Sequence, residues 1–242
     1  MQEKSVSQAI DFRRSVRIYD SDKPIDTNNV KKCIIQATLA PSSSNMQLWE
    51  FHHIVSKNKI HQLAKSCFNQ PAANTAKQLV VIVVRRDLWK KRLNSNINNI
   101  KSSLSKIKNL DPVKKQKALY YYEKLVPMIY SDFMGIKGFF KKIYVKFVGL
   151  YKPMYQEVGN GDVRVIAHKS AALAAQSFMI SMAGIGYDTC PMEGFDSNRV
   201  KKNLNISSKS EISMIIGCGI RKKDGLYGKR YRVPNDETYH IH

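Results

Sequence analysis

The sequence predicts an α+β fold in one domain that spans residues 1–242. Runs typical of helices and runs typical of strands are mixed along the chain, without the regular strand–helix alternation of a doubly wound parallel sheet. Hydrophobic residues make up 43% of the 242 residues, which is enough for a sizeable core and excludes a disordered chain. The length suits one large domain.

The first third of the chain is expected to form helices and strands with well-marked ends. Asp26 and Thr27 are capping candidates ahead of an apolar i, i+3, i+4, i+7 pattern, and Pro41 ends that pattern. The run Leu79–Val84 is apolar throughout, which is typical of a strand covered on both faces. The expected elements are a short amphipathic helix at Val6–Phe12, a helix carrying Val30, Cys33, Ile34 and Ala37, strands at Trp49–Val55 and Leu79–Val84, and between them a short helix carrying Ile60, Leu63 and Ala64.

The last third is expected to contain a buried helix, a short helix and a strand. The stretch His168–Gly184 is apolar nearly all round, and such a helix requires burial on all sides. A short helix is expected at Asn198–Leu204. A strand is expected at Ile212–Ile216, and the glycines that follow it mark its end.

Between these parts lies a basic and aromatic insert at residues 88–155. The net charge of the chain is +21, and the segment Arg85–Lys152 holds 17 lysines and arginines against four acidic residues, so 13 of these charges lie there. Its polar half, Lys90–Lys117, is typical of a solvated helix or a mobile loop. Its second half, Tyr120–Tyr155, interleaves aromatic side chains with lysines and therefore has an apolar surface to cover.

Composition also excludes several classes of protein and site. The uneven charge disfavours a uniformly basic nucleic-acid binder, and no nucleic-acid-binding motif is present. Four cysteines without a CxxC spacing are expected to be reduced and packed as small hydrophobes, and no metal site is expected. The N-terminal residues lack the apolar run of a secretory signal peptide, so a cytoplasmic location is expected.

Four segments carry candidate binding groups. Arg13, Arg14, Ser15 and Arg17 would make an anion cradle, because guanidinium groups match phosphate geometry, although a solvated basic turn is the simpler interpretation. A polar loop, APSSSNMQLW, begins at Ala40 between a helix and a strand. The other two segments are CPMEGFD at residues 190–196 and KRYRVP at residues 229–234, which adds two more arginines.

In this order and spacing the four segments resemble the nitroreductase family of FMN-dependent enzymes. The similarity runs from Val6 to Pro234, the insert excepted, and begins with RRSVRIYD. The resemblance implies a three-layer fold with a central, mostly antiparallel sheet flanked by helices and a basic helical insert. It also implies a homodimer with FMN at the subunit interface and a tail that extends across the partner.

The resemblance further implies roles for individual residues. The arginine-rich segments would hold the FMN phosphate and the pyrimidine edge of the ring, with Arg17 nearest the flavin N1 and C2 carbonyl. Asn69 corresponds loosely to an asparagine that contacts the ring. The implied FMN-binding residues are Arg13, Arg14, Ser15, Arg17, Arg230 and Arg232 at the anionic groups, Ser42, Ser43 and Asn45 from the partner subunit, Asn69, and the backbone of Pro191, Met192, Glu193 and Gly194 at flavin N5.

The implied activity is a two-step, ping-pong exchange. Hydride passes from NADH or NADPH to flavin N5, and then to a nitroaromatic, a quinone or a similar planar acceptor. No side chain is expected to act as catalytic acid, base or nucleophile, and the absence of a GxGxxG fingerprint fits one shared site.

The sequence leaves alternatives open for the function and for the insert. Related enzymes of the same fold carry out reductive dehalogenation or flavin modification, and a basic nucleic-acid-binding or anionic-membrane-binding module is an alternative of a different class. The insert would form a lid over the acceptor or a helical pair on the outside of the core. A peripheral membrane contact through residues 136–152 is the less favoured alternative.

Overall fold

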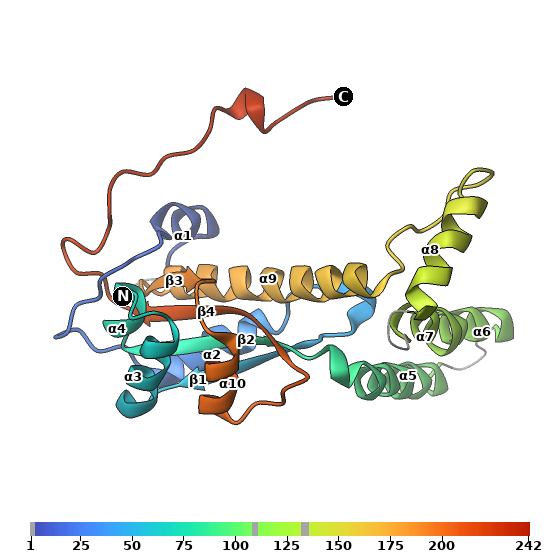
Figure 1. Cartoon of the computed structure of the whole chain (residues 1–242), viewed down its shortest axis with the longest axis horizontal. Coiled ribbons are helices and arrows are strands. Elements are labelled where there is room, and N and C mark those ends of the chain that lie inside the picture. The colour runs from blue at the N-terminus through green and yellow to red at the C-terminus, as the bar shows by residue number, and fades with distance from the viewer. Residues whose placement is uncertain (1–2, 108–110, 132–135) are drawn as a thin grey trace.

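The computed structural model describes residues 3–107, 111–131 and 136–242. Within these residues the core is an antiparallel sheet of four strands in the order β1-β2-β4-β3 (Figure 1). The strands are β1 (Trp49–Ile54), β2 (Gln78–Val84), β3 (Asp188–Met192) and β4 (Glu211–Gly219). The prediction of an α+β fold with a mostly antiparallel sheet is confirmed.

Helices cover both faces of this sheet and form the outer layers. On one face lie α2 (Thr27–Ala37) and α9 (Asn160–Gly184), with α1 (Val6–Phe12) packed against α9. On the other face lie α3 (Lys57–Ser66), α4 (Pro71–Asn74) and α10 (Ser197–Leu204). Helix–sheet–helix layering therefore holds, as expected.

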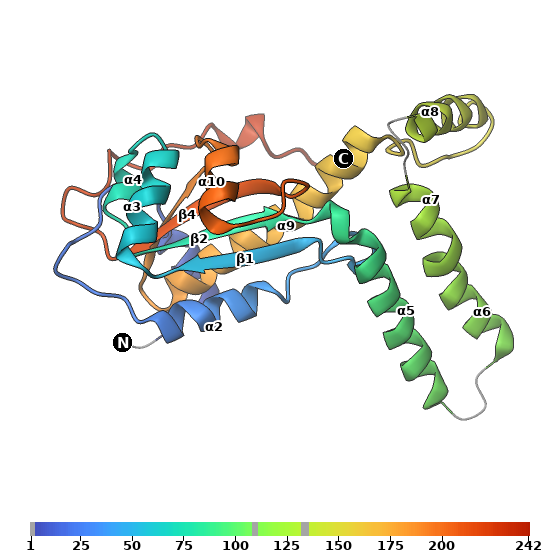
Figure 2. The ribbon, with the colours of Figure 1, turned by 60° about the horizontal axis from the view of Figure 1, so that its bottom comes forward.

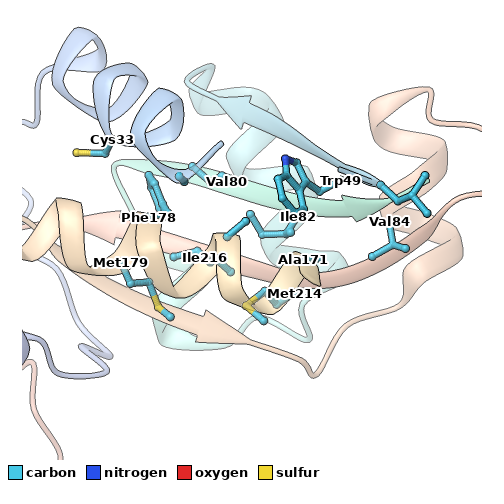
Figure 3. Packing of buried hydrophobic residues seen from close by; sticks show 14 of the residues in the cluster. Cys33, Trp49, Val80, Ile82, Val84, Ala171, Phe178, Met179, Met214 and Ile216 are labelled. Atoms are coloured by element: carbon cyan, nitrogen blue, oxygen red, sulfur yellow. The ribbon is translucent and has the colours of Figure 1, made fainter. Parts of the chain in front are cut away.

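The central strand β2 divides the core into two clusters. Val80, Ile82 and Val84 point to the side of α2 and α9, where they meet Trp49 and Phe178 (Figure 3). The alternate residues of β2 point to the opposite side, under α3, α4 and α10. All seven residues of β2 are buried, which confirms the expectation of a strand covered on both faces. The four cysteines are free and buried, also as expected.

Helix α9 differs from its prediction in two ways. It begins at Asn160, eight residues before the predicted start, where the backbone N–H of Gly159 donates to the Asp162 carboxylate at 2.9 Å. It is also not buried on all sides in the single chain, because Ala172 and Leu173 are exposed while the small residues on its opposite face are buried. One side of this helix, on which the apolar Val165 and Leu173 lie beside the polar Lys169 and Gln176, is thus left uncovered by its own chain.

Strand β3 lies in a segment for which no strand was predicted. Pro191 lies in it, and proline is tolerated because β3 is an edge strand, whose one neighbouring strand among the described residues is β4, apart from an isolated bridge between Thr189 and Ser15. Strand β4 also runs further than expected, through the glycines to Gly219. The helix ends Asp26, Phe12 and Ala37 agree with the sequence pattern.

The insert is helical and projects beyond the N-terminal end of α9 (Figure 2). Trp89 stacks on Tyr130 with ring centroids 6.2 Å apart, which joins the start of α5 to the end of α7. The polar half is mainly a helix, which resolves the alternative of helix or loop. Its elements are α5 (Trp89–Ser105), α6 (Pro112–Tyr120), a π-helix (Tyr121–Leu125), α7 (Val126–Tyr130) and α8 (Ile136–Val148). In the described part of the chain, no helix combines the length and apolar character needed to cross a membrane.

Candidate functional site

Four of the residues predicted to bind the anionic groups of a ligand come directly after α1. They are Arg13, Arg14, Ser15 and Arg17. Arg13 is the residue at which the helix ends, because its backbone turns to an extended conformation there. Ser15 forms a parallel bridge with Thr189 of β3, and the backbone N–H of Arg17 donates to the carbonyl of Gly225 at 2.8 Å. This segment therefore lies between the edge strand β3 and the start of the C-terminal tail.

The tail brings the second arginine pair to the same place. Arg230 donates from Nη2 to the carbonyls of Asp11 at 2.7 Å and Arg13 at 2.9 Å. Arg14 in turn donates from Nη2 to the carbonyl of Gly228 at 2.7 Å. Two arginine clusters that are more than 200 residues apart in the sequence are thus locked together by backbone hydrogen bonds.

Where these segments meet they enclose a cavity of about 250 Å³. Its walls bring together all six residues predicted for the anionic groups of a ligand. The lining residues are Arg13, Arg14, Ser15 and Arg17, with Leu226, Tyr227, Gly228, Lys229, Arg230, Tyr231 and Arg232 from the tail.

The electrostatics of this cavity favour an anion. Burial lowers the pKa of Arg13, and the positive charges of Arg230, Arg232 and Arg14 lower it further. Among the residues that the structure describes, no carboxylate forms an ion pair with Arg13, Arg14 or Arg232, and Arg230 has only Asp11 at 3.9 Å. Like charges held this close are mutually repulsive, and a bound dianion such as a phosphate would relieve the repulsion.

The segment of residues 191–194 lies at the end of β3. The carbonyl of Gly194 accepts a hydrogen bond from the side-chain amide of Gln70 at 2.6 Å. Asn69, next to Gln70 in the turn before α4, has a left-handed backbone with φ 53°. Gln70 therefore links this turn to the loop of residues 191–194, and Ser15 pairs with the preceding strand β3 through its bridge with Thr189.

The polar groups here fit a phosphorylated ligand. Thr189 is 1% exposed, and its Oγ1 has no hydrogen-bond partner among the described residues. The backbone of Thr189 pairs with Ser15, which lines the cavity, so this unpaired hydroxyl lies one residue pair away from the cavity wall. Buried polar atoms are nearly always paired, so the unpaired Thr189 hydroxyl is unusual. No cluster of three or more metal-ligating side chains occurs within the described residues.

The structure does not bring Ser42, Ser43 and Asn45 to this cavity. The backbone N–H of Ser43 donates to Ser170 Oγ at 3.3 Å, near the middle of α9. The backbone N–H of Lys4, just before α1, donates to the carbonyl of Gly184 at the C-terminal end of α9, and the first arginines follow the other end of α1. Fourteen residues of helix separate Ser170 from Gly184, which at the α-helical rise is roughly 21 Å. Ser42, Ser43 and Asn45 do not line the arginine cavity.

The Ser42–Asn45 loop is held under backbone strain by the insert. Ser44, Asn45 and Gln47 have φ values of 50°, 48° and 47°, a region that non-glycine residues seldom adopt. Asn96 of α5 accepts from Asn45 Nδ2 at 3.1 Å and donates to the Asn45 carbonyl at 2.9 Å. Tyr121 of the π-helix shares a hydrogen bond with Ser44 Oγ at 2.8 Å.

Sequence reasoning missed four residues of this arrangement. Gln70 and Thr189 lie beside predicted residues and gave no pattern of their own. Asn96 and Tyr121 belong to the insert, whose composition revealed an apolar and basic surface but not which side chains turn back to the core. Local spacing carries no signal for contacts that span 51 and 77 residues.

Residues 10–220 match the model of the Nitroreductase family, which is most of the chain. The chain belongs to the nitroreductase family. Its relatives include MhqN of Bacillus subtilis, provisionally named an NAD(P)H nitroreductase, which is 27% identical over 228 residues and covers 94% of each chain. Another is the CLA biosynthesis enone reductase of Lactiplantibacillus plantarum, 21% identical over 230 residues, covering 90% of this chain and 87% of the other.

Solved structures show the same fold. One is a provisionally named NAD(P)H:FMN oxidoreductase of Staphylococcus epidermidis, with a TM-score of 0.72, 20% identity, and coverage of 100% of this chain and 97% of the other. A second is a provisionally named nitroreductase of Exiguobacterium sibiricum in complex with FMN, with a TM-score of 0.69 and 20% identity. It covers 100% of this chain and 99% of the other. Both structures match this chain over nearly its whole length.

Proposed function

We propose that this nitroreductase-family protein is an FMN-dependent oxidoreductase that takes hydride from NADH or NADPH and passes it to a nitroaromatic, a quinone or a similar planar acceptor. The observation that carries the proposal is the cavity in which five arginines converge without enough carboxylates to neutralise them. The name of the relative MhqN supports NAD(P)H as the hydride donor, and the FMN complex of a structural neighbour supports the cofactor.

The arginine residues would bind and orient the cofactor. Arg13, Arg14, Arg230 and Arg232 would hold the phosphate, because guanidinium groups give paired, charge-assisted hydrogen bonds to phosphate oxygens. Arg17 would lie at the pyrimidine edge and stabilise negative charge there. Bound FMN would supply reversible two-electron chemistry at its N5 position.

The residues at the end of β3 would set the ring in place. Gln70 fixes the Gly194 carbonyl, so the backbone of residues 191–194 is rigid before a ligand arrives. A rigid backbone edge keeps donor and acceptor in stacking distance and spares the cost of ordering it during the reaction. The chain itself therefore contributes position and charge, and protons would come from water.

The proposal includes a homodimer with the cofactor at the subunit interface. The Ser42–Asn45 loop is too far from the arginine cavity of its own chain, so it would serve the cavity of the partner. Leu173 and Val165 of α9 are 51% and 52% exposed, and they provide an apolar surface for a second copy. The tail also needs a partner, since Tyr239 and Ile241 are 68% and 82% exposed in the single chain.

The visible spectrum of the purified protein tests the cofactor. We expect flavin bands near ~450 and ~370 nm that persist through gel filtration. The double variant Arg17→Ala/Arg232→Ala should lose at least about tenfold in FMN affinity, because each charge-assisted hydrogen bond contributes roughly 1.5–3 kcal/mol. Lys65→Ala/Lys202→Ala, which removes two exposed charges from elsewhere, is the control. Full FMN affinity in the arginine variant would contradict the assignment.

Substrate assays test the acceptor. NADH and NADPH should each be tried with a nitroaromatic, a quinone and an enone, and the initial rates should form parallel double-reciprocal lines for a two-step exchange. Intersecting lines would mean that donor and acceptor bind together and would contradict one shared site.

A further inference from the structure

Helix α8 presents an apolar face to solvent at the outer end of the insert. At about 100° per residue, five large side chains cover an arc of roughly 140° on this helix. Gly138 and Val145, on the opposite side, are buried, so the exposed arc points directly away from the body of the protein. The residues of the arc are Phe139, Phe140, Ile143, Tyr144 and Phe147, each of them 53–64% exposed.

The apolar arc continues past the end of the helix. Leu150 and Tyr151, in the turn that follows, are 74% and 79% exposed. Tyr151 packs edge-on against Phe147 with ring centroids 5.9 Å apart, so the turn extends the same surface. Monomeric proteins seldom expose so many neighbouring large apolar side chains without a partner for them. We call these seven residues the α8 face.

Lysines border the α8 face on both sides. By helical position Lys142 and Lys146 flank its Phe139 edge, and Lys141 lies beyond its Tyr144 edge. Lys142 pairs with Asp162 at 3.0 Å, yet its side chain stays 55% exposed. Residues 133–156 contain five lysines and no acidic residue. Lysines therefore border the apolar arc on both sides, and one of them, Lys142, is paired with Asp162.

We propose that the α8 face docks the protein on an anionic lipid surface. Aromatic and aliphatic side chains flanked by lysines are the pattern of helices that lie in a membrane interface, where the rings enter the acyl boundary and the ammonium groups remain with the headgroups. Negative headgroups attract the lysines, so charge and apolar character act on the same surface. A second copy of the chain fits less well, because two α8 faces in contact would bring the lysines of both copies together.

The position of α8 in the fold agrees with this role. In both views α8 stands beyond the N-terminal end of α9, and Figure 1 shows it far from α1 (Figures 1 and 2). A single projecting helix can lie flat on a bilayer without a rearrangement of the sheet. The docking does not depend on flavin chemistry, so it can fail or hold independently of the proposed function.

Co-sedimentation with lipid vesicles tests the docking. The full-length protein should bind vesicles of phosphatidylcholine with phosphatidylglycerol, and it should bind pure phosphatidylcholine vesicles much less. Phe139→Ser/Phe147→Ser should weaken binding to the anionic vesicles by roughly tenfold or more, because two large side chains no longer enter the interface. The control is Ile107→Ser/Val113→Ser, which removes exposed apolar side chains from the same insert and should bind like the wild type.

Fluorescence gives a second readout that folding defects cannot mimic. Brominated lipids should quench Phe147→Trp more strongly than Val113→Trp on anionic vesicles. Docking is overturned if the wild type fails to bind, or if the double serine variant binds as well as the wild type. It is also overturned if that variant changes the oligomeric state in lipid-free buffer, since a second copy would then be what covers the face. A raised Michaelis constant for a soluble acceptor with unchanged vesicle binding would assign the face to the acceptor pocket instead.

Discussion

At the scale of single residues, the arginines fall into two groups that differ in the charge of their neighbours. Arg85 is held by Asp87 at 3.0 Å and by Glu50 at 2.9 Å, and hydrogen bonds from it to these carboxylates raise its pKa. Arg13 lies among other guanidinium groups, and burial beside them lowers its pKa. The first arrangement is neutralised by carboxylates of the protein itself, whereas Arg13 has no carboxylate partner among the described residues.

The packing of the Tyr19 ring requires a glycine at position 219. A Cβ at Gly219 would lie 2.6 Å from Cδ1 of Tyr19, and the Tyr19 hydroxyl is fixed by a 2.8 Å hydrogen bond to the Gly217 carbonyl. The ring is buried and cannot move aside. We expect Gly219→Ala to lower the free energy of unfolding by about 1–3 kcal/mol in urea denaturation.

Gly161 provides the matched control for that substitution. A Cβ there would meet nothing within 4 Å, and the position is helical. Gly161→Ala should therefore stabilise the protein, by up to about 1 kcal/mol. Equal effects of the two substitutions would show that the Tyr19 ring does not constrain Gly219.

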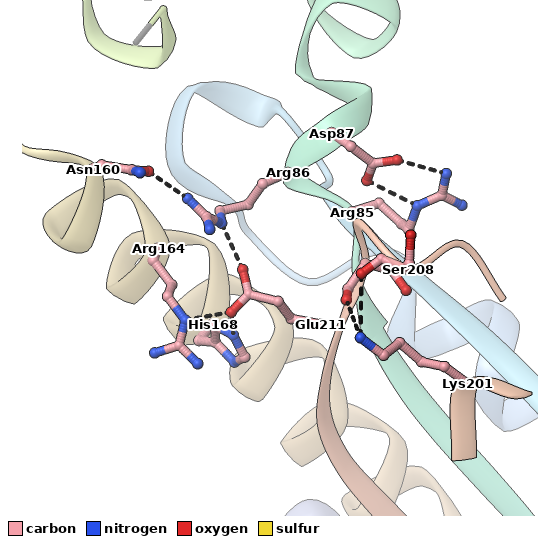
Figure 4. Close-up of polar contacts among 10 residues, drawn as sticks. Arg85, Arg86, Asp87, Asn160, Arg164, His168, Lys201, Ser208 and Glu211 are labelled. Atoms are coloured by element: carbon pink, nitrogen blue, oxygen red, sulfur yellow. Dashed lines mark hydrogen bonds and ion pairs between the residues drawn. The ribbon is translucent and has the colours of Figure 1, made fainter. Parts of the chain in front are cut away.

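Glu211 should make the stability of the protein depend on pH, and the direction of this effect follows from its neighbours. Burial alone would raise its pKa, but hydrogen bonds from Arg86 at 2.8 Å and from Arg164 more than offset this and hold the pKa below its ordinary value (Figure 4). A carboxyl group with a lowered pKa in the folded state stabilises that state above its unfolded pKa of about 4.3, and the contribution is lost as the pH falls through the folded value. The stability advantage of the wild type over Glu211→Gln should therefore shrink between about pH 6 and pH 3.

Chemical denaturation at several pH values measures this difference. Glu237→Gln, at an exposed position in the tail, is the control and should follow the wild type throughout. A difference between wild type and Glu211→Gln that stays constant as the pH falls would contradict the prediction.

At the scale of elements, the insert and the Ser42–Asn45 loop act as one unit. Tyr121 and Asn96 bond to a loop whose backbone is strained, and such strain persists only when surrounding contacts maintain it. If this loop contacts FMN of the partner, Tyr121→Phe should increase the rate of FMN dissociation roughly two- to tenfold, in line with the loss of one hydrogen bond.

Flavin fluorescence after dilution measures that rate. Tyr120→Phe removes the neighbouring hydroxyl, on a side chain that is 55% exposed, and should leave the rate unchanged. If the Tyr121→Phe protein releases FMN at the wild-type rate, the loop does not contact the cofactor.

The elements that sequence could predict are those whose periodicity reports burial. Strand β2 has an unbroken apolar run, and α2 has a capped stripe, so both were found within a few residues of their ends. Strand β3 was missed because five residues with a proline give no alternating pattern. The early start of α9 was missed because Asp162 and Arg164 interrupt its apolar run.

The candidate site likewise contains parts that the sequence predicts and parts that it does not. The arginine-rich segments were found because their chemistry is written in neighbouring residues. Their meeting with the tail, and the clamps from Asn96 and Tyr121, depend on contacts between distant segments that no local pattern encodes. The separation of Ser43 from the cavity follows from the length of α9, a property of the folded chain.

At the scale of the whole molecule, the two halves of the predicted site lie at different places along α9. The arginine cavity is joined to the C-terminal part of this helix and the Ser42–Asn45 loop to its middle. A two-fold related second chain with its α9 antiparallel to the first would place the loop of one copy near the cavity of the other. Each dimer would then hold two equivalent sites, and each site would need residues of both chains.

Mixing two differently impaired variants tests this arrangement directly. One variant, Arg13→Ala/Arg17→Ala, lacks its cavity, and the other, Ser43→Ala/Asn45→Ala, lacks its loop contacts. In a mixed dimer, one site combines both defects, while the other combines the intact cavity of one chain with the intact loop of the other. Random mixing yields half mixed dimers, so about a quarter of wild-type activity should return after co-refolding of two inactive variants.

Sites formed within single chains give the opposite result. Each chain would then carry its own defect into any dimer, and mixing would restore nothing. Mixing each variant with itself is the matched control, and sedimentation would verify that both remain dimers. Because the substitutions are the same in both cases, the recovered fraction depends only on whether the cavity and the loop that meet at one cofactor come from one chain or from two.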